Sequence, residues 1–330
     1  MPRAVAIPTS ILIAPDSFKG TFTAVEVATA AGRGLQAGGR DVDLCPVADG
    51  GEGTLAALMT ALGGESGLAK VSDPLGRSMQ APFGIRGQTG ILETAAASGL
   101  DLIAKPERDA VAASTFGTGE LILATIAAGA QTVYLGVGGS ATTDGGAGAI
   151  KAIRAGGGLA GARLVVLCDV RTPFEDAARV FGPQKGARPE QVRQLSRRLQ
   201  ALARRLPRDP RGVPMSGAAG GLAGGLWATL DAELVPGAAF VLDAVGFDAR
   251  MRRARAVVTG EGKLDRQSLV GKAVSEVATR ARQAGVPCHA IVGTRELDDF
   301  GARILDLQTV LEASTLKEIE AAGRRLAKLI

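Results

Sequence analysis

The sequence predicts an α/β protein in which a parallel-sheet domain, made from both ends of the chain, is interrupted by a second α/β domain. Strands and helices alternate near the N-terminus, turn signals become dense after Gly63–Gly64, and strand-and-loop character returns from Arg255 onward. Strand, loop and helix in alternation are typical of a parallel sheet. We therefore predict a discontinuous domain over residues 1–68 and 241–330, with an inserted mixed α/β domain over residues 69–240.

Two strand–loop–helix units begin the predicted parallel-sheet domain. The first strand is a continuous apolar run that ends before Pro15, as expected of a strand buried on both faces. Thr23, followed three residues later by Glu26, has the pattern of a capping box and marks the start of the first helix. In chain order, we expect strands at residues 10–14 and 42–47 and helices at residues 23–35 and 55–62.

The inserted domain is predicted from its turn signals and from helical periodicity. Spaced glycines and prolines between Val71 and Leu92 indicate antiparallel strands or hairpins. Further elements are expected as a helix at 115–128 ended by Gly129, a strand at 132–137, a helix from Ala147, a strand at 164–167 and a helix at 189–206. Strands at 255–258 and 286–292 and a final helix at 315–330 return to the first domain and complete its sheet.

Composition excludes several classes of site. The chain has 46 glycines, roughly twice the usual ~7% share, which indicates many tight loops. Aromatic residues are only 3%, so stacking platforms for sugars or single-stranded nucleic acid are not expected. Three scattered cysteines form no CxxC pair, and His289 is the only histidine. Zinc ribbons, disulfide frameworks and two-histidine zinc sites are therefore excluded.

The charge balance favours a small anionic ligand. The formal net charge of +5 is mild, and an anionic metabolite or nucleotide explains its sign as well as a nucleic acid does. No stretch has the ~18 apolar residues of a membrane span, and residues 1–16 lack the pattern of a signal peptide. We expect a cytoplasmic protein with no nucleic-acid or membrane partner, and the sequence leaves open whether it forms a homodimer.

Two loops share the pattern Asp-Gly-Gly-x-Gly before a helix, at residues 49–53 and 144–148. Successive glycines let backbone N–H groups point into one concavity at a helix N-terminus, which favours phosphate, although a simple tight turn has the same pattern. The segment 138–144 adds three hydroxyl groups and Asp144, a residue suited either to Mg²⁺ or to a substrate proton. No Walker motif is present, and no GxGxxG opens a helix directly after a predicted strand.

Three further segments carry candidate groups. Asp16 and Ser17, at the end of the first strand, suit substrate hydroxyls, and Lys19 suits a carboxylate or phosphate. In the loop 260–268, two carboxylates four residues apart suit a divalent ion. A rigid glycine-flanked turn at 181–187 presents a lysine, and an aspartate follows the strand at 164–167. Each of these segments also has an ordinary structural interpretation as a turn or a solvated loop.

Taken together, five segments resemble the bacterial glycerate kinase family, type I. In chain order they are Ala14–Gly20, Val47–Thr54, Gly138–Gly146, Phe181–Ala187 and Thr259–Ser268. The resemblance implies ATP-dependent, Mg²⁺-assisted phosphorylation of D-glycerate, in this family usually at the 2-hydroxyl to give 2-phosphoglycerate. It also implies a flavodoxin-like domain interrupted by the second α/β domain, with the active site in the cleft between them.

We assign roles to the residues of these motifs on the basis of this resemblance. The expected catalytic residues are Asp144, Lys19, Asp169 and Lys185. The expected substrate-binding residues are Asp16, Ser17, Lys19, Asp49 and Glu52. The expected ligands of the ATP phosphates are Gly138, Gly139, Ser140, Thr142, Thr143, Gly145 and Lys272. The expected metal ligands are Asp144, Glu261 and Asp265.

Alternative functions remain open at this point. The chain is equally compatible with a kinase for another small hydroxy acid, or with a glycerate kinase that forms 3-phosphoglycerate. A non-catalytic nucleotide-binding regulator with the same fold is the second alternative, and the intact carboxylates and glycines of the motif loops argue against it.

Overall fold

The computed structural model describes residues 9–269 and 271–330, and the chain divides into two compact units. Unit 1 contains the chain up to Asp49 together with Val241–Ile330, and unit 2 contains Gly50–Phe240. The units are divided after Asp49 and after Phe240, whereas the sequence predicts domain boundaries after residues 68 and 240. Helix α2 (Thr54–Leu62) packs on strands of unit 2, which is why the boundary moves. Of the stretch in which we expect no signal peptide, residues 1–8 lie outside the described residues.

Unit 1 is built on a five-stranded parallel sheet. Its strands are β1 (Ile11–Pro15), β2 (Val42–Leu44), β9 (Ala256–Leu264), β10 (Cys288–Arg295) and β11 (Leu307–Glu312). They lie in the order β11-β10-β9-β1-β2, and every neighbouring pair is parallel. Numbered within the unit, this is the flavodoxin-like order 2-1-3-4-5. Both the predicted fold class and the return of the C-terminal strands to this sheet are confirmed.

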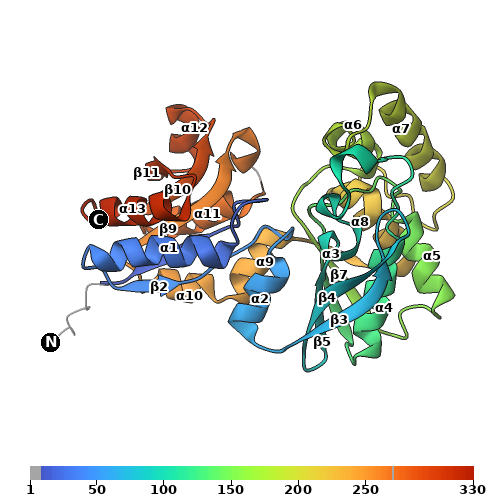
Figure 1. The fold of residues 1–330 in the computed structure, drawn as a ribbon, viewed down its shortest axis with the longest axis horizontal. Coiled ribbons are helices and arrows are strands. Elements are labelled where there is room, and N and C mark those ends of the chain that lie inside the picture. The colour runs from blue at the N-terminus through green and yellow to red at the C-terminus, as the bar shows by residue number, and fades with distance from the viewer. Residues whose placement is uncertain (1–8, 270) are drawn as a thin grey trace. The chain divides into compact units, whose positions relative to one another are not determined.

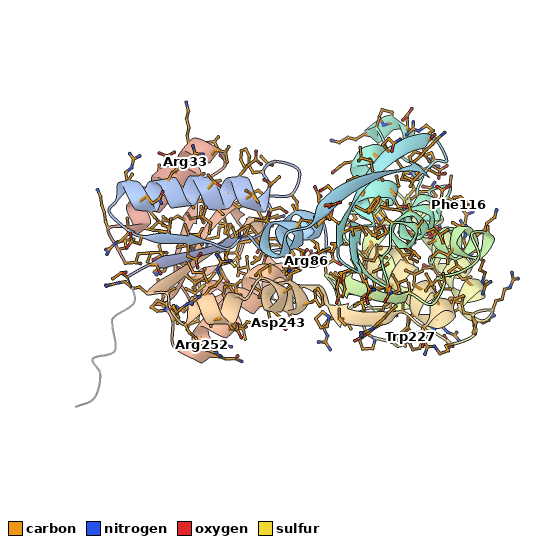
Figure 2. The ribbon with its side chains drawn as sticks, turned by 90° about the horizontal axis from the view of Figure 1, so that it is seen from below. Arg33, Arg86, Phe116, Trp227, Asp243 and Arg252 are labelled. Carbon is orange, nitrogen blue, oxygen red and sulfur yellow. The ribbon has the colours of Figure 1, made fainter. Side chains whose placement is uncertain are left out.

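Helices cover both faces of the unit 1 sheet (Figure 1), so its inner strands β1, β9 and β10 are largely buried. They are α1 (Ala24–Ala37), α10 (Phe247–Met251), α11 (Ala273–Ala284), α12 (Asp299–Ile304) and α13 (Leu316–Leu326), and α9 (Gly237–Ala244) joins the two units. Helices α1 and α13 pack together over Ile11 and Ile13, while α11 packs on β9, β1 and β10. Arg33 on the outer side of α1 is exposed (Figure 2).

Unit 2 is built on a six-stranded mixed sheet in the order β3-β4-β5-β6-β7-β8. Its strands are β3 (Glu65–Ser72), β4 (Ser78–Arg86), β5 (Thr89–Glu93), β6 (Thr132–Gly136), β7 (Arg163–Cys168) and β8 (Glu233–Pro236). The first three are antiparallel, as the turn signals predicted, and β5 to β8 are parallel. Parallel strands bring the loops that follow β6 and β7 to one edge of the sheet.

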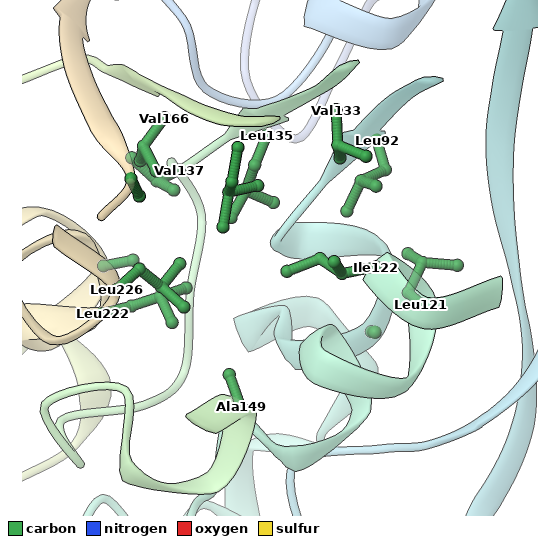
Figure 3. Packing of buried hydrophobic residues seen from close by; sticks show 14 of the residues in the cluster. Leu92, Leu121, Ile122, Val133, Leu135, Val137, Ala149, Val166, Leu222 and Leu226 are labelled. Carbon is green, nitrogen blue, oxygen red and sulfur yellow. The ribbon is translucent and has the colours of Figure 1, made fainter. Parts of the chain in front are cut away.

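The core of unit 2 lies between its sheet and helices α4, α5 and α8. Besides α2, its helices are α3 (Ala95–Ser98), α4 (Phe116–Ala127), α5 (Ala147–Ala155), α6 (Ala177–Phe181), α7 (Pro189–Ala203) and α8 (Ala218–Leu230). Figure 3 shows Leu135 and Val166 of the sheet facing Leu121, Leu222 and Leu226 of the helices. This packing fixes the loop that connects β6 to α5. Among the described residues, no helix is both long and apolar enough to cross a membrane.

Candidate functional site

The first candidate site is a cavity of about 310 Å³ in unit 1, at the carboxyl ends of β1 and β9. The chain order of the strands reverses direction between these two strands, which makes this point the topological switch of the sheet. Open α/β sheets bind ligands at such a point. The cavity brings together five predicted residues: Asp16, Ser17, Lys19, Glu261 and Lys272.

Asp16 is a buried acidic group on the β1 side of this cavity. Its backbone N–H donates to the carbonyl of Gly260 on β9 (2.8 Å), and its Oδ1 accepts from the Ser17 N–H (2.7 Å). Burial raises the pKa of Asp16 well above its ordinary value, and the nearby Asp49 carboxylate raises it further, whereas Lys19 opposes the rise. A carboxyl group with a raised pKa is suited to accept and return a proton near neutral pH.

Lys19 and Asp49 form an ion pair that links the two loops of this unit. Lys19 Nζ lies 2.9 Å from Asp49 Oδ2; the Asp49 side chain is buried, while the Lys19 side chain is 44% exposed. Asp49 therefore holds the ammonium group, while the Lys19 side chain remains partly exposed. A lysine held in this way can bind a second anion, such as a substrate carboxylate.

Glu261, on the β9 side of the same cavity, has one occupied and one unoccupied carboxylate oxygen. Its Oε2 lies 3.3 Å from Lys272 Nζ, and its buried Oε1 has no hydrogen-bond partner among the described residues. Burial raises the pKa of Glu261, and the positive charge of Lys272 opposes that effect. The hydroxyl of Ser17 is buried and is likewise without a partner in the described part of the chain. Such groups are normally satisfied, so both indicate a polar ligand.

The second candidate site lies in unit 2, where two glycine-rich loops press against each other. The Val137 N–H donates to the carbonyl of Gly50 (2.8 Å), and a methyl group at position 138 would lie 2.5 Å from the Gly51 Cα. The same methyl would lie 3.2 Å from Asp169 Oδ2, and one at position 139 would lie 3.9 Å from Glu52 Oε2. Glycine is therefore required for the two loops to approach this closely. Their approach brings the carboxylates of Asp169 and Glu52, both predicted site residues, close to the loop.

Lys185 places a buried ammonium group beneath this loop. Its side chain is 3% exposed, and Nζ donates to Ser140 Oγ (3.0 Å) and to the Thr142 carbonyl (2.5 Å). Burial lowers the pKa of Lys185 to about 8, although the negative charges of Asp144 and Asp169 oppose this effect. Lys185 lines a cavity of about 70 Å³ together with Gly138, Gly139, Ser140 and Asp169, all of them predicted site residues.

Asp144 is buried among backbone donors rather than directed into this cavity. Its Oδ2 accepts from the N–H and the hydroxyl of Thr115 (both 2.9 Å) and from the Gly148 N–H (3.1 Å), and its Oδ1 accepts from the Gly146 N–H (3.0 Å). These bonds tie the start of α5 to the start of α4. They give Asp144 a structural role, and its predicted role as base or metal ligand stays a prediction.

The remaining residues predicted to bind the ATP phosphates differ in their surroundings. The hydroxyls of Thr142 and Thr143 are buried without a hydrogen-bond partner among the described residues. The Gly145 N–H donates to the Gly220 carbonyl (3.1 Å), so it is not available to a phosphate. Lys272 belongs to unit 1, where it pairs with Glu261, whereas the loop 138–145 belongs to unit 2.

The three predicted metal ligands are divided between the two units. Asp144 belongs to unit 2, whereas Glu261 and Asp265 belong to unit 1. Asp265 Oδ1 accepts from the Gln267 N–H (2.8 Å), and its Oδ2 lies 4.0 Å from Lys263 Nζ. Within residues 9–269 and 271–330, no three or more His, Cys, Asp or Glu side chains are placed to hold a metal ion.

Some cavity residues were not predicted from the sequence. Thr294 and Ser314 line the unit 1 cavity, and Gln184 and Ala219 line the cavity of unit 2. Thr294 lies near the carboxyl end of β10 and Ser314 follows β11, positions in a parallel sheet that could have identified them. Ala219 lies in a glycine-rich segment whose sequence resembles a flexible linker, and only its long-range contacts reveal its place.

Comparisons with known proteins agree on one family over nearly the whole chain. Residues 11–158 and 154–320 match the Glycerate kinase family. The chain is 39% identical to a glycerate kinase of Halalkalibacterium halodurans over 324 residues, covering 86% of this chain and 85% of the relative. It is 38% identical to a glycerate 2-kinase of Escherichia coli K12 over 330 residues, covering 88% and 86%. A crystal structure from Salmonella typhimurium LT2, assigned as a glycerate kinase 2, superposes with a TM-score of 0.80 at 33% identity and 98% coverage of both chains.

Proposed function

Because the chain belongs to the glycerate kinase family, we propose that it transfers the γ-phosphoryl group of ATP to D-glycerate and forms 2-phosphoglycerate. The observation that carries this proposal is the cradle in unit 2, where a glycine-rich loop lies above the buried Lys185. A cytoplasmic location, where ATP is available, is part of the same proposal. The active site in the cleft between the two domains remains a prediction from the sequence.

The loop 138–143 is assigned to the phosphates of ATP. Its glycines allow a compact loop whose backbone N–H groups can point toward an anion, and its buried Thr142 and Thr143 hydroxyls have no partner among the described residues. Lys185 supplies the positive charge that the transferring phosphoryl group requires. Asp169, predicted as a catalytic residue, and Glu52, predicted as a substrate-binding residue, border the same loop.

Glycerate is assigned to the unit 1 cavity. Lys19, held by Asp49, binds the glycerate carboxylate, and the Ser17 hydroxyl, which has no partner among the residues that the structure describes, binds a substrate hydroxyl. Asp16 receives the proton of the attacking hydroxyl, because its raised pKa makes it a suitable acceptor. In-line transfer depends mostly on the orientation of the two substrates and on charge neutralisation, so no histidine is needed.

Mg²⁺ fits this site as a companion of ATP. Kinases commonly bind Mg²⁺ through one or two carboxylates together with substrate phosphates, so a protein cage of three carboxylates is not required. Glu261 would hold the ion, because its Oε1 is buried and has no partner in the described part of the chain. When bound, the ion neutralises charge on the phosphates.

The proposal is tested with purified protein, ATP, Mg²⁺ and D-glycerate in an assay coupled to ADP release. We expect turnover with D-glycerate, and we expect phosphorus NMR to show 2-phosphoglycerate as the product. A phosphorus signal at the 3-position would assign the other hydroxyl. A panel of small hydroxy acids distinguishes a kinase for a different substrate. ATP binding without turnover on any member of the panel would contradict the proposal and support a regulator.

A further inference from the structure

Helix α8 begins with a backbone conformation that helices do not normally contain. Three consecutive residues lie in the left-handed region: Ala219 (φ 50°, ψ 44°), Gly220 (φ 66°, ψ 32°) and Gly221 (φ 88°, ψ 2°). Glycine adopts this region freely, but alanine does so only at a cost in free energy. A strained residue persists only where its surroundings hold it, and such residues are concentrated at functional sites. The conformation therefore requires an explanation from its contacts.

This left-handed segment lies directly against the loop assigned to the ATP phosphates. The Gly220 carbonyl accepts from the Gly145 N–H (3.1 Å). A methyl group at position 220 would lie 2.0 Å from the Thr142 carbonyl oxygen and 2.7 Å from the Thr143 Cα. Only a glycine allows this contact, and any larger residue must displace the Thr142 carbonyl.

The Thr142 carbonyl is also one of the two acceptors that hold Lys185. Lys185 Nζ donates to it at 2.5 Å and to Ser140 Oγ at 3.0 Å. Ala219 lines the same small cavity as Lys185. A continuous chain of contacts thus runs from the left-handed segment through one carbonyl group to a buried ammonium group.

We propose that the left-handed segment 219–221 is a positioning device for Lys185, and that it acts by fixing the Thr142 carbonyl. The segment itself touches no reacting atom. Its role is to keep an acceptor on the lysine, so that the ammonium group stays charged and stays in place beneath the phosphate loop. The expected effect on turnover rests on the proposed kinase function, whereas the expected effect on the position and titration of Lys185 does not.

Gly220→Ala tests the proposal, with Gly246→Ala as its matched control. Gly246 has nearly the same φ (67° against 66°), but a methyl group there would meet nothing within 4 Å. Both variants carry the same backbone strain, and only Gly220→Ala displaces the Thr142 carbonyl. Ala219→Gly is the second variant, because glycine accepts the local conformation and keeps the protein folded while the segment becomes less rigid.

The readout is the titration of Lys185 itself. Trace labelling with acetic anhydride from about pH 6 to about pH 10, followed by mass spectrometry of the peptide that contains Lys185, measures the midpoint without any catalysis. Loss of an acceptor disfavours the charged lysine, so we expect Gly220→Ala to lower the midpoint by about one pH unit. Ala219→Gly should lower it by less, and Gly246→Ala should leave it unchanged.

Activity supplies an independent second readout. With ATP and D-glycerate, we expect Gly220→Ala to lower kcat by about 100-fold, with the alkaline limb of the kcat profile moved to lower pH. Gly246→Ala should keep the wild-type profile. A wild-type Lys185 midpoint in Gly220→Ala, or in Ala219→Gly if the first variant does not fold, would overturn the proposal. A shifted midpoint in a protein that does not phosphorylate glycerate would instead refute the proposed function and leave the positioning role intact.

Discussion

At the scale of single residues, Lys19 is the cation in unit 1 best placed to bind the carboxylate of a substrate. We predict that Lys19→Ala raises the KM for glycerate by about 10- to 100-fold, the range expected for loss of one charge-assisted hydrogen bond. The KM for ATP should change little, because the loop assigned to its phosphates lies in unit 2. Steady-state kinetics with each substrate varied in turn measures both constants.

The control for Lys19→Ala is Lys317→Ala, which removes an exposed lysine of α13 and should leave both constants unchanged. If Lys19→Ala raised the KM for ATP and left that for glycerate unchanged, Lys19 would belong to the phosphate site. The sequence identified Lys19 from its place after a strand, but it could not reveal the ion pair with Asp49. That pair joins positions 30 residues apart.

Asp144 is expected to stabilise the fold, because its carboxylate accepts hydrogen bonds from three backbone N–H groups and one hydroxyl. In Asp144→Asn, an amide NH₂ group must face at least one of the four donors that now reach the carboxylate. We predict a loss of about 1–3 kcal/mol in the free energy of unfolding, measured by chemical denaturation.

Thr115→Val is the companion variant for Asp144→Asn, because it removes one of the donors without touching the carboxylate. It should also lower the stability. If Asp144→Asn abolished turnover while its unfolding curve stayed that of the wild type, Asp144 would act directly on the substrates, as its sequence motif suggests.

At the scale of elements, the final helix depends on a cap that the sequence already predicted. Thr315 Oγ1 accepts from the Glu318 N–H (3.2 Å), and the Glu318 carboxylate accepts in return from the N–H groups of Thr315 and Ser314. We predict that Thr315→Ala lowers the free energy of unfolding by about 0.5–2 kcal/mol, and that Thr315→Ser, which keeps the acceptor, costs much less. Equal losses in the two variants would show that the hydroxyl does not stabilise the helix.

The elements that could be predicted are those whose signals are local. The capping boxes at Thr23 and Thr315 and the apolar run of β1 are complete within a few residues, and the structure confirms them. Helix α8 was not predicted, because glycine has a low helix propensity. It forms because packing against the phosphate loop and the core overrides that propensity.

At the scale of the whole molecule, the sequence could not show which loops fold together. The two Asp-Gly-Gly-x-Gly loops are alike in sequence, and both end up in unit 2 except for Asp49, the first residue of the earlier loop. That assignment depends on the packing of α2 on β4 and β5, contacts between distant positions that no local pattern encodes. The close approach of Gly220 to the Thr142 carbonyl, which was not predicted from the sequence, is also a contact between distant positions.

The unit 1 site as a whole is built at the expense of stability. Asp16 and Glu261 are buried carboxyl groups whose pKa values are raised chiefly by burial. A group whose pKa is higher in the folded than in the unfolded state contributes its full stability below the unfolded pKa, and that contribution is lost as the pH rises through the folded pKa. As the pH rises, the folded protein must therefore hold the buried carboxylate charges of Asp16 and Glu261. An asparagine or glutamine side chain at the same position would carry no charge.

We predict that Asp16→Asn raises the melting temperature at about pH 8 and that this gain disappears toward about pH 4, where both the wild-type carboxyl and the amide are neutral. The asparagine oxygen keeps the bond from the Ser17 N–H, so the local geometry is preserved. Asp41→Asn, at an exposed position, should show no such pH-dependent gain. Thermal unfolding across the pH range measures the difference. A gain that is constant with pH, or a loss at pH 8, would show that the folded state holds the Asp16 charge without cost.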